Sequence, residues 1–288
     1  MSIDSATVIR GLTMACLTGL LLSVGLRLTA KEVIESLKKC RLGSILLANF
    51  VAVPLLVVVL INVFHLKSEL AVGMILLGAA PFAPVVPVFA KMARADLALA
   101  AGLTSLIPLL SAFLTPLVSI CAMWSLPGAR ELKFNVLGVL VILMATITGP
   151  LLLGVAVHHF APNFKRRVLR PVEILSEATG ALSLTVVTLT EFRSILQTGW
   201  VALLTMLISS EISLALGYYL GGKEKGSRRV VALGTSNRNI ALALLLAVAS
   251  FPGTGVVPAV VANGLLLILT GLLHVAFWRF VQDRKLGV

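Results

Sequence analysis

A run of small and polar residues interrupts one of the most apolar stretches of this sequence. The run reads Gly-Thr-Ser-Asn-Arg-Asn over residues 234–239, and apolar sequence lies on both sides of it. A helix confined to residues 240–251 would be too short to cross a bilayer, which takes about 20 residues. We therefore expect the polar run to lie at membrane depth. Its candidate binding residues are Ser236, Asn237, Arg238 and Asn239.

A second interruption is a triplet of prolines, Pro81, Pro84 and Pro87, at three-residue spacing. A proline inside a helix removes an amide donor and clashes with the preceding turn, so the three cannot all lie in one regular helix. In lipid, each carbonyl group freed in this way is costly unless protein or water satisfies it. The triplet therefore predicts a discontinuous helix, and it adds the backbone at Pro84 and Pro87 to the candidate site.

The charge of Arg238 requires an explanation, because an arginine at the bilayer centre costs at least about 2.5–3.5 kcal/mol. One interpretation is that the guanidinium binds an anionic substrate group, near the positive ends of half-helices. The other is that a buried carboxylate neutralises it. The available acids are Glu211 and Glu177, and Glu211 is favoured because it lies in the apolar run 197–220. If they pair, protonation of Glu211 would release the arginine, so proton coupling is a hypothesis.

The composition places these segments in a membrane. The chain has 288 residues, of which 58% are hydrophobic and 12% charged, whereas soluble domains have about 45–50% apolar and about 25% charged residues. The apolar runs are long enough for helices, and none shows the alternation of a membrane β-barrel. We predict a single all-α transmembrane domain over 1–288. Its nine predicted spans are 6–27, 43–64, 69–92, 97–122, 133–160, 172–190, 197–220, 229–250 and 257–282.

The net charge of +12 predicts cytoplasmic loops here rather than a nucleic-acid partner, because basic residues gather on the cytoplasmic side of membrane proteins. Eighteen of the 24 Lys and Arg residues fall in one alternate set of loops. These are Arg27, Lys31, Lys38, Lys39, Arg41, Lys91, Arg94, Lys165, Arg166, Arg167, Arg170, Lys223, Lys225, Arg228, Arg229, Arg279, Arg284 and Lys285. We expect an inner or plasma membrane protein with its N-terminus outside and its C-terminus in the cytoplasm. The three cysteines form no CxxC pair, and we predict no metal site or cofactor.

The order of these features resembles the bile acid:sodium symporter family in its nine-helix form. The resemblance rests on the segment from Gly19 to Val33, on Gly73 to Pro116 with its proline-marked break, and on Asn239 followed by Ile-Ala-Leu-Ala. It implies an inverted repeat with two crossing discontinuous helices, and substrate in a crevice between two parts. The core part would be 43–122 and 197–282. The panel part would be 6–27, 133–160 and 172–190.

The sequence departs from this family where the family binds two sodium ions. In the resemblance, the Ser-Asn pair of the family's first break corresponds to Val86-Pro87, its ligand Glu to Gly234, and its ligand Gln to Arg238. Only Thr104 matches a sodium-ligand position. A site that loses a carboxylate and gains a guanidinium repels a cation, by about 4 kcal/mol at ~4 Å and an effective dielectric of 20. We therefore expect transport that does not use the family's sodium sites.

These observations predict a secondary transporter of a small or amphipathic organic anion, not an enzyme. A sodium-coupled symporter with a relocated ion site is an alternative. A membrane-embedded group transferase would need clustered acids or histidines near a leaflet surface, and a channel would need a continuous polar lining. The substrate, the coupling ion, the direction of transport and the oligomeric state stay open.

Overall fold

The computed structural model describes residues 5–27, 41–125, 141 and 144–286, and within these ranges every regular element is a helix. Six helices are long and apolar enough to cross a membrane, and a bent pair, Leu97–Ser111 with Phe113–Met123, gives up to a seventh. The six are Thr7–Arg27, Leu42–Val63, Pro162–Thr190, Trp200–Leu220, Lys225–Ser250 and Val256–Gln282. The predicted all-helical membrane protein is confirmed at this level. The count of nine stays a prediction, because six or seven such helices are found among the described residues, and residues 133–140 and 142–143 lie outside them.

Several predicted spans consist of shorter pieces. The first half of the chain contains α1 (Ser5–Arg27), α3 (Leu42–Leu47), the π-helix η1 (Ala48–Ala52), α4 (Val53–Val63), α5 (Ser68–Gly78), α6 (Val86–Met92) and α7 (Leu97–Met123). The second half contains η3 (Met144–Thr148), α9 (Gly149–Phe160), α10 (Pro162–Thr190), α11 (Phe192–Leu196), α12 (Trp200–Leu220), α13 (Lys225–Ser236), α14 (Ile240–Ser250) and α15 (Val256–Leu286). The third and eighth predicted spans are therefore the broken pairs α5–α6 and α13–α14.

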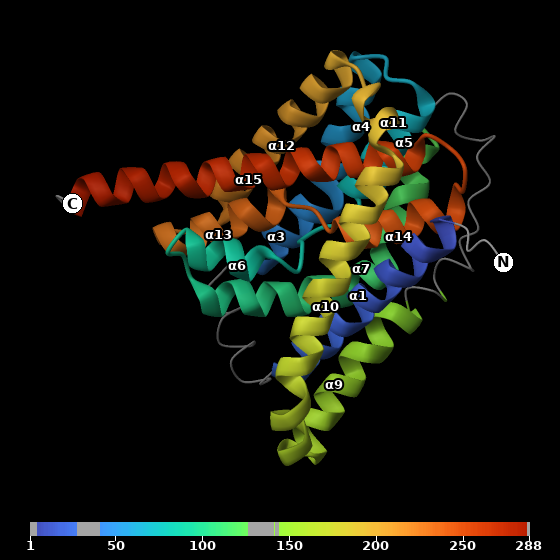
Figure 1. Ribbon diagram of the computed structural model, residues 1–288. Helices are drawn as coiled ribbons and strands as arrows, with labels where there is room; N and C mark the ends of the chain where they lie inside the picture. Colours follow the sequence, from blue (N-terminus) through green and yellow to red (C-terminus); the bar gives the residue numbers. More distant parts are fainter. Residues whose placement is uncertain (1–4, 28–40, 126–140, 142–143, 287–288) are drawn as a thin grey trace.

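Helix α1 packs along α9 and α10, and the three form one bundle (Figure 1). Glycines permit the close approach. A Cβ atom at Gly25 would lie 2.2 Å from the carbonyl oxygen of Leu151, and one at Gly19 would lie 2.2 Å from Oγ of Ser176. Small residues of this kind let helix backbones approach in a membrane, where lipid is as apolar as the side chains.

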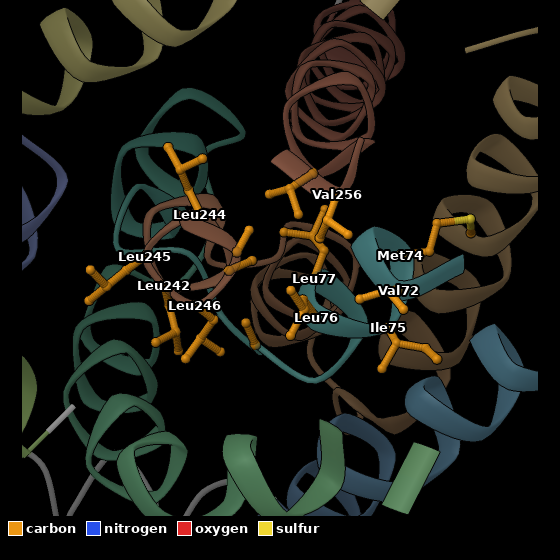
Figure 2. Packing of buried hydrophobic residues seen from close by; sticks show 14 of the residues in the cluster. Val72, Met74, Ile75, Leu76, Leu77, Leu242, Leu244, Leu245, Leu246 and Val256 are labelled. Carbon is orange, nitrogen blue, oxygen red and sulfur yellow. The ribbon is translucent and has the colours of Figure 1, made fainter. Parts of the chain in front are cut away.

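The half-helices α5 and α14 form the buried centre of the molecule, beside the start of α15 (Figure 2). All residues of α5 from Ala71 to Gly78 are buried, and so are Leu242 to Val248 of α14. A helix that is apolar on every face fits a position surrounded by protein. The two broken pairs are therefore central elements and not a lipid-facing surface.

Three of the basic loops meet at one end of the molecule. The Nη1 atom of Arg229, at the start of α13, donates to the carbonyl oxygen of Ala93 at 2.9 Å and to Oε1 of Gln282 at 3.0 Å. Arg41 and Lys223 line one further surface pocket near this end. Loops that the charge pattern assigns to one side thus lie together.

Candidate functional site

The two breaks cross and bond to each other through their backbones. The amide of Ala83 donates to the carbonyl oxygen of Asn237 at 3.0 Å, and the amide of Asn239 donates to that of Ala80 at 2.8 Å. Thr115 of α7 adds a third bond, from its Oγ1 to the carbonyl oxygen of Ala79 at 2.8 Å. Unpaired backbone groups are costly away from water. Each break therefore supplies partners that the other lacks, which makes the crossing a single structural unit.

The prolines differ in their roles at the first break. Helix α5 ends at Gly78, and Pro81 and Pro84 lie in the irregular segment that follows. Pro87 lies in the first turn of α6, where the missing amide would have no helical partner. The triplet therefore ends one helix and starts the next, as its spacing predicted. Pro84 and Pro87 are both half-buried.

Two of the predicted binding residues terminate the half-helices of the second break. Oδ1 of Asn239 accepts from the amide of Leu242 at 3.0 Å and caps the N-terminus of α14. Nδ2 of Asn237 donates to the carbonyl oxygen of Leu233 at 3.1 Å, near the C-terminus of α13. Oγ of Ser236 lies 3.4 Å from the same carbonyl oxygen. The polar run thus stabilises the ends that it creates.

Phe82, in the first break, packs its ring against Gly234, at the second break. Its φ angle is +54°, in the left-handed region that bulky residues rarely adopt, and its side chain is fully buried. A Cβ atom at Gly234 would lie 2.0 Å from Cε1 and 2.1 Å from Cζ of this ring. The ring therefore occupies the space of any side chain at position 234, including the carboxylate that the family resemblance would place there.

Arg238 contacts a residue that the sequence prediction missed. Its Nη1 atom donates to the backbone carbonyl oxygen of Asn49 at 3.3 Å. This carbonyl lies in the π-helix η1, where the amide of Val53 donates to the carbonyl oxygen of Ala48. The next amide in that pattern would be residue 54, which is a proline and has none. Pro54 thus leaves the Asn49 carbonyl free for the guanidinium. A lone asparagine five residues before a proline, inside an apolar run, was the available signal.

The side chain of Asn49 also joins the two parts of the site. Its Nδ2 donates to Oγ1 of Thr235 at 3.2 Å and to the carbonyl oxygen of Ile45 at 2.9 Å. Its Oδ1 is buried without a hydrogen-bond partner among the described residues. Asn49 of η1 therefore bonds to Thr235 and to Arg238, the residues that lie before and after Ser236 at the second break.

The rest of the guanidinium is buried and unpaired. Only 3% of Arg238 is exposed, and neither Nε nor Nη2 has a hydrogen-bond partner within the part of the chain that the structure describes. No carboxylate of those residues lies within 4.0 Å of it. A cavity of about 20 Å³ adjoins Arg238 and Ser236, between α4, α5, α12 and α15.

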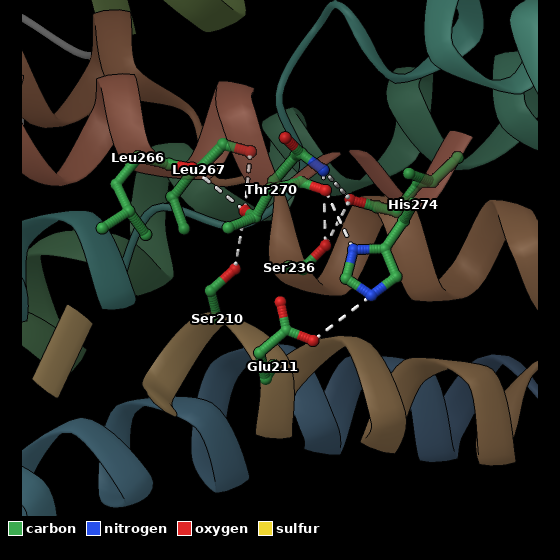
Figure 3. A network of polar contacts seen from close by, with 9 residues as sticks. Ser210, Glu211, Ser236, Leu266, Leu267, Thr270 and His274 are labelled. Atoms are coloured by element: carbon green, nitrogen blue, oxygen red, sulfur yellow. Dashed lines mark hydrogen bonds and ion pairs between the residues drawn. The ribbon is translucent and has the colours of Figure 1, made fainter. Parts of the chain in front are cut away.

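The predicted partner of Arg238 is wrong. Glu211 pairs with His274 of α15, with 3.2 Å between Oε2 and Nε2 (Figure 3). Glu211 lies on the side of α12 that faces α15. Arg238 instead bonds to η1. Glu177 is exposed on α10. The sequence analysis did not identify His274 as a partner of Glu211.

Thr104, the single match to a family sodium ligand, lies on α7, a helix that packs against α6 and α13. Its side chain is 3% exposed, and its Oγ1 has no hydrogen-bond partner among the described residues. The neighbouring Ser105, by contrast, donates to the carbonyl oxygen of Ala101 at 2.7 Å. Thr104 therefore keeps a free hydroxyl in the packed region beside the first break.

The apolar helices and the two crossed breaks define an integral membrane protein of the transporter class. The model of the sodium bile acid symporter family matches residues 14–197, more than half of the chain. The chain belongs to this family, as the sequence resemblance indicated.

Curated relatives are distant transporters. The chain is 24% identical over 279 residues to the uncharacterized sodium-dependent transporter YocS of Bacillus subtilis, with 93% of this chain and 83% of the relative covered. It is 25% identical to the sodium-dependent organic anion transporter of Rattus norvegicus, over 83% of this chain and 66% of that protein. It is 22% identical to a probable chloroplastic sodium/metabolite cotransporter, BASS2, of Oryza sativa, over 90% and 62%.

Proposed function

We propose that this protein is a secondary transporter of a small or amphipathic organic anion that works by alternating access and does not use the sodium sites of its family. The observation on which the proposal depends is Arg238, a buried guanidinium at the crossing with no carboxylate partner among the described residues. Transporters of this kind bind substrate near the bilayer midplane, where discontinuous helices meet. A fixed cation at that place favours an anionic cargo.

Sodium does not fit the residues that replace the family's ligands. The guanidinium of Arg238 is a fixed positive charge, and the ring of Phe82 fills the side-chain space of Gly234. Val86-Pro87 offers no side-chain oxygen. Na⁺ prefers several oxygen ligands, so the charge and the chemistry of this set both oppose it. We propose that Arg238 supplies the positive charge that sodium supplies in other members.

The packing supports two parts that could move against each other. The bundle of α1, α9 and α10 corresponds to the proposed panel, and the broken pairs with α12 and α15 belong to the proposed core (Figure 1). Helix α1 also contacts α14, so the two parts meet beside the second break. We propose that the substrate enters between them when they separate. Its contacts would come from Ser236, Asn237, Arg238, Asn239, Thr104 and the backbone at Pro84 and Pro87.

The proposed orientation places the N-terminus outside and the C-terminus in the cytoplasm of the inner or plasma membrane. The bonds from Arg229 to Ala93 and Gln282 support it, because they join loops rich in Lys and Arg. Such loops are retained on the cytoplasmic side.

A second candidate is a sodium-coupled organic anion symporter with its ion site elsewhere in the chain. The names of the three relatives favour it, since each includes sodium. Purified protein in proteoliposomes distinguishes the two. A thermal-shift screen of organic anions identifies a ligand, and its counterflow is then measured in sodium and in potassium. We expect equal counterflow in both salts. A steep dependence on sodium would establish the second candidate.

A further inference from the structure

We propose that the crossing holds a chloride-sized inorganic anion beside Arg238, in addition to the organic anion that the protein transports. The site is the cavity of about 20 Å³ that adjoins the second break. One buried water needs roughly 10–15 Å³. The cavity therefore admits a single monatomic ion or water, and it has no room for a molecule with a carbon skeleton.

Every polar side chain that lines this cavity can donate a hydrogen bond. The polar lining comprises Ser209, Ser210, Ser213, Ser236, Arg238 and Asn263. Ser209 and Ser213 are one helical turn apart on α12 and share a face. Neither they nor Asn263 make a hydrogen bond with another described residue. Their hydroxyl and amide groups are therefore available to a ligand.

These free hydroxyls contrast with two buried serines of α7. Ser111 and Ser105 on α7 donate to the carbonyl oxygens one turn earlier in their own helix, at 2.9 and 2.7 Å. This local bond is the usual way in which a serine satisfies itself inside a helix. Ser209 and Ser213 make no such bond, and both line the cavity that Arg238 also lines.

The charge of the lining selects the sign of the occupant. Arg238 is 3% exposed, its Nε and Nη2 atoms have no partner among the described residues, and no described carboxylate is within 4.0 Å. A buried charge is strongly unfavourable unless a counter-charge or hydrogen bonds compensate it. A halide supplies the counter-charge and accepts bonds from the free hydroxyls. A cation would meet the guanidinium at contact distance.

This inference shares Arg238 with the proposed function, but it concerns binding and can be tested without transport. Purified full-length protein in nanodiscs is titrated with radioactive chloride at constant ionic strength, with gluconate as the replacing anion. We expect one saturable chloride per chain and a melting temperature that rises with chloride. We expect bromide to compete, and exchange of sodium for potassium to have no effect.

The variants locate the site. We expect Arg238→Gln to abolish saturable binding and Ser213→Ala to weaken it about tenfold, since it removes one hydrogen bond to a charged group. Ser111→Ala is the matched control, a buried serine bonded to its own helix, and should bind as the wild type does. If Arg238→Gln does not fold, the chloride affinities of Ser209→Ala and Ser213→Ala are compared with that of Ser111→Ala. Weaker binding in the first two alone supports the site.

Two results would overturn the inference. One is the absence of saturable chloride binding to the wild type, which would mean that water alone fills the cavity. The other is unchanged binding in Ser213→Ala and Ser209→Ala. Organic anion counterflow is measured on the same preparation. Chloride binding without counterflow refutes the proposed function alone, and counterflow without chloride binding refutes the anion site alone.

Discussion

The ring of Phe82 lies against the backbone of Gly234, where a Cβ atom would come within 2.0 Å of the ring. The contact joins the two breaks by packing, in addition to their two backbone hydrogen bonds. A residue with a side chain at position 234 and a phenylalanine at position 82 are thus incompatible in this arrangement.

Gly234→Ala should therefore destabilise the protein. Overpacking of a buried site costs about 1–3 kcal/mol, so we expect a melting temperature several degrees lower in a thermal-shift assay. Gly43→Ala is the control, because a Cβ atom there would have no neighbour within 4 Å. The double variant Gly234→Ala/Phe82→Leu removes the ring atoms that clash with the new Cβ atom, so it should recover part of the lost melting temperature. Equal melting temperatures for Gly234→Ala and Gly43→Ala would contradict the contact.

Replacing Arg238 with an apolar residue should raise the stability of the protein and abolish its transport. Arg238→Met removes an unpaired buried charge, and replacing buried charges with apolar residues has stabilised other proteins by roughly 1–4 kcal/mol. We expect a higher melting temperature in chloride-free buffer and loss of organic anion counterflow. Arg193→Met, at an exposed arginine of α11, should leave counterflow unchanged. Counterflow at the wild-type rate in Arg238→Met would remove the guanidinium from the mechanism.

Pro54 should matter although the sequence analysis did not include it in the candidate site. Its missing amide leaves the Asn49 carbonyl oxygen free to accept from Arg238 at 3.3 Å. In Pro54→Ala, the new amide competes for carbonyl groups of η1, so the guanidinium loses the Asn49 carbonyl as a hydrogen-bond partner and loses its position. We expect slower organic anion counterflow in a folded protein, with reduced affinity for the anion. Pro54 lies in the first turn of α4, where a proline is well tolerated. The control is Pro162→Ala, because Pro162 lies in the first turn of α10, outside the candidate site.

The sequence predicted the breaks better than it predicted what they contact. Proline spacing and a polar run in apolar sequence have direct backbone consequences, so both discontinuities follow from local rules. The bond between Arg238 and Asn49 joins residues far apart in the chain. Nothing local distinguishes the Asn49 carbonyl from others except Pro54, and its effect requires a π-helix that periodicity does not reveal.

The prediction that Glu211 pairs with Arg238 was wrong for a related reason. The prediction chose Glu211 as the acid for Arg238 because it lies in an apolar run, whereas helix packing brought α12 against α15. His274 then lies opposite Glu211. Which faces of two apolar helices meet depends on the shapes of many side chains, and a single sequence with weak periodicity does not specify them. The core and panel division stays a prediction for the same reason.

The pair of Glu211 and His274 is the candidate for proton coupling in place of the pair expected from sequence. Protonation of a carboxylate that faces an imidazole changes the charge of the pair by one unit, and ionisable residues within membrane spans commonly serve as proton relays. Ser210, next to Glu211, bonds to Thr270 at 3.1 Å, and the carbonyl oxygen of Thr270 lies 2.9 Å from Nδ1 of His274 (Figure 3). Ser210 also lines the cavity of Arg238.

If the pair couples protons, Glu211→Gln should abolish the acceleration of uptake by an inward proton gradient while counterflow at equal pH persists. His274→Gln should have the same effect, because each variant removes one half of the pair. Tyr218 and Tyr219 line the same pocket as His274, and Tyr218→Phe should retain the response. Glu191→Gln, at the end of α10, controls for loss of a carboxylate elsewhere. Uptake is followed in proteoliposomes with an imposed pH step, and a wild-type response in Glu211→Gln would assign proton coupling, if any, to another group.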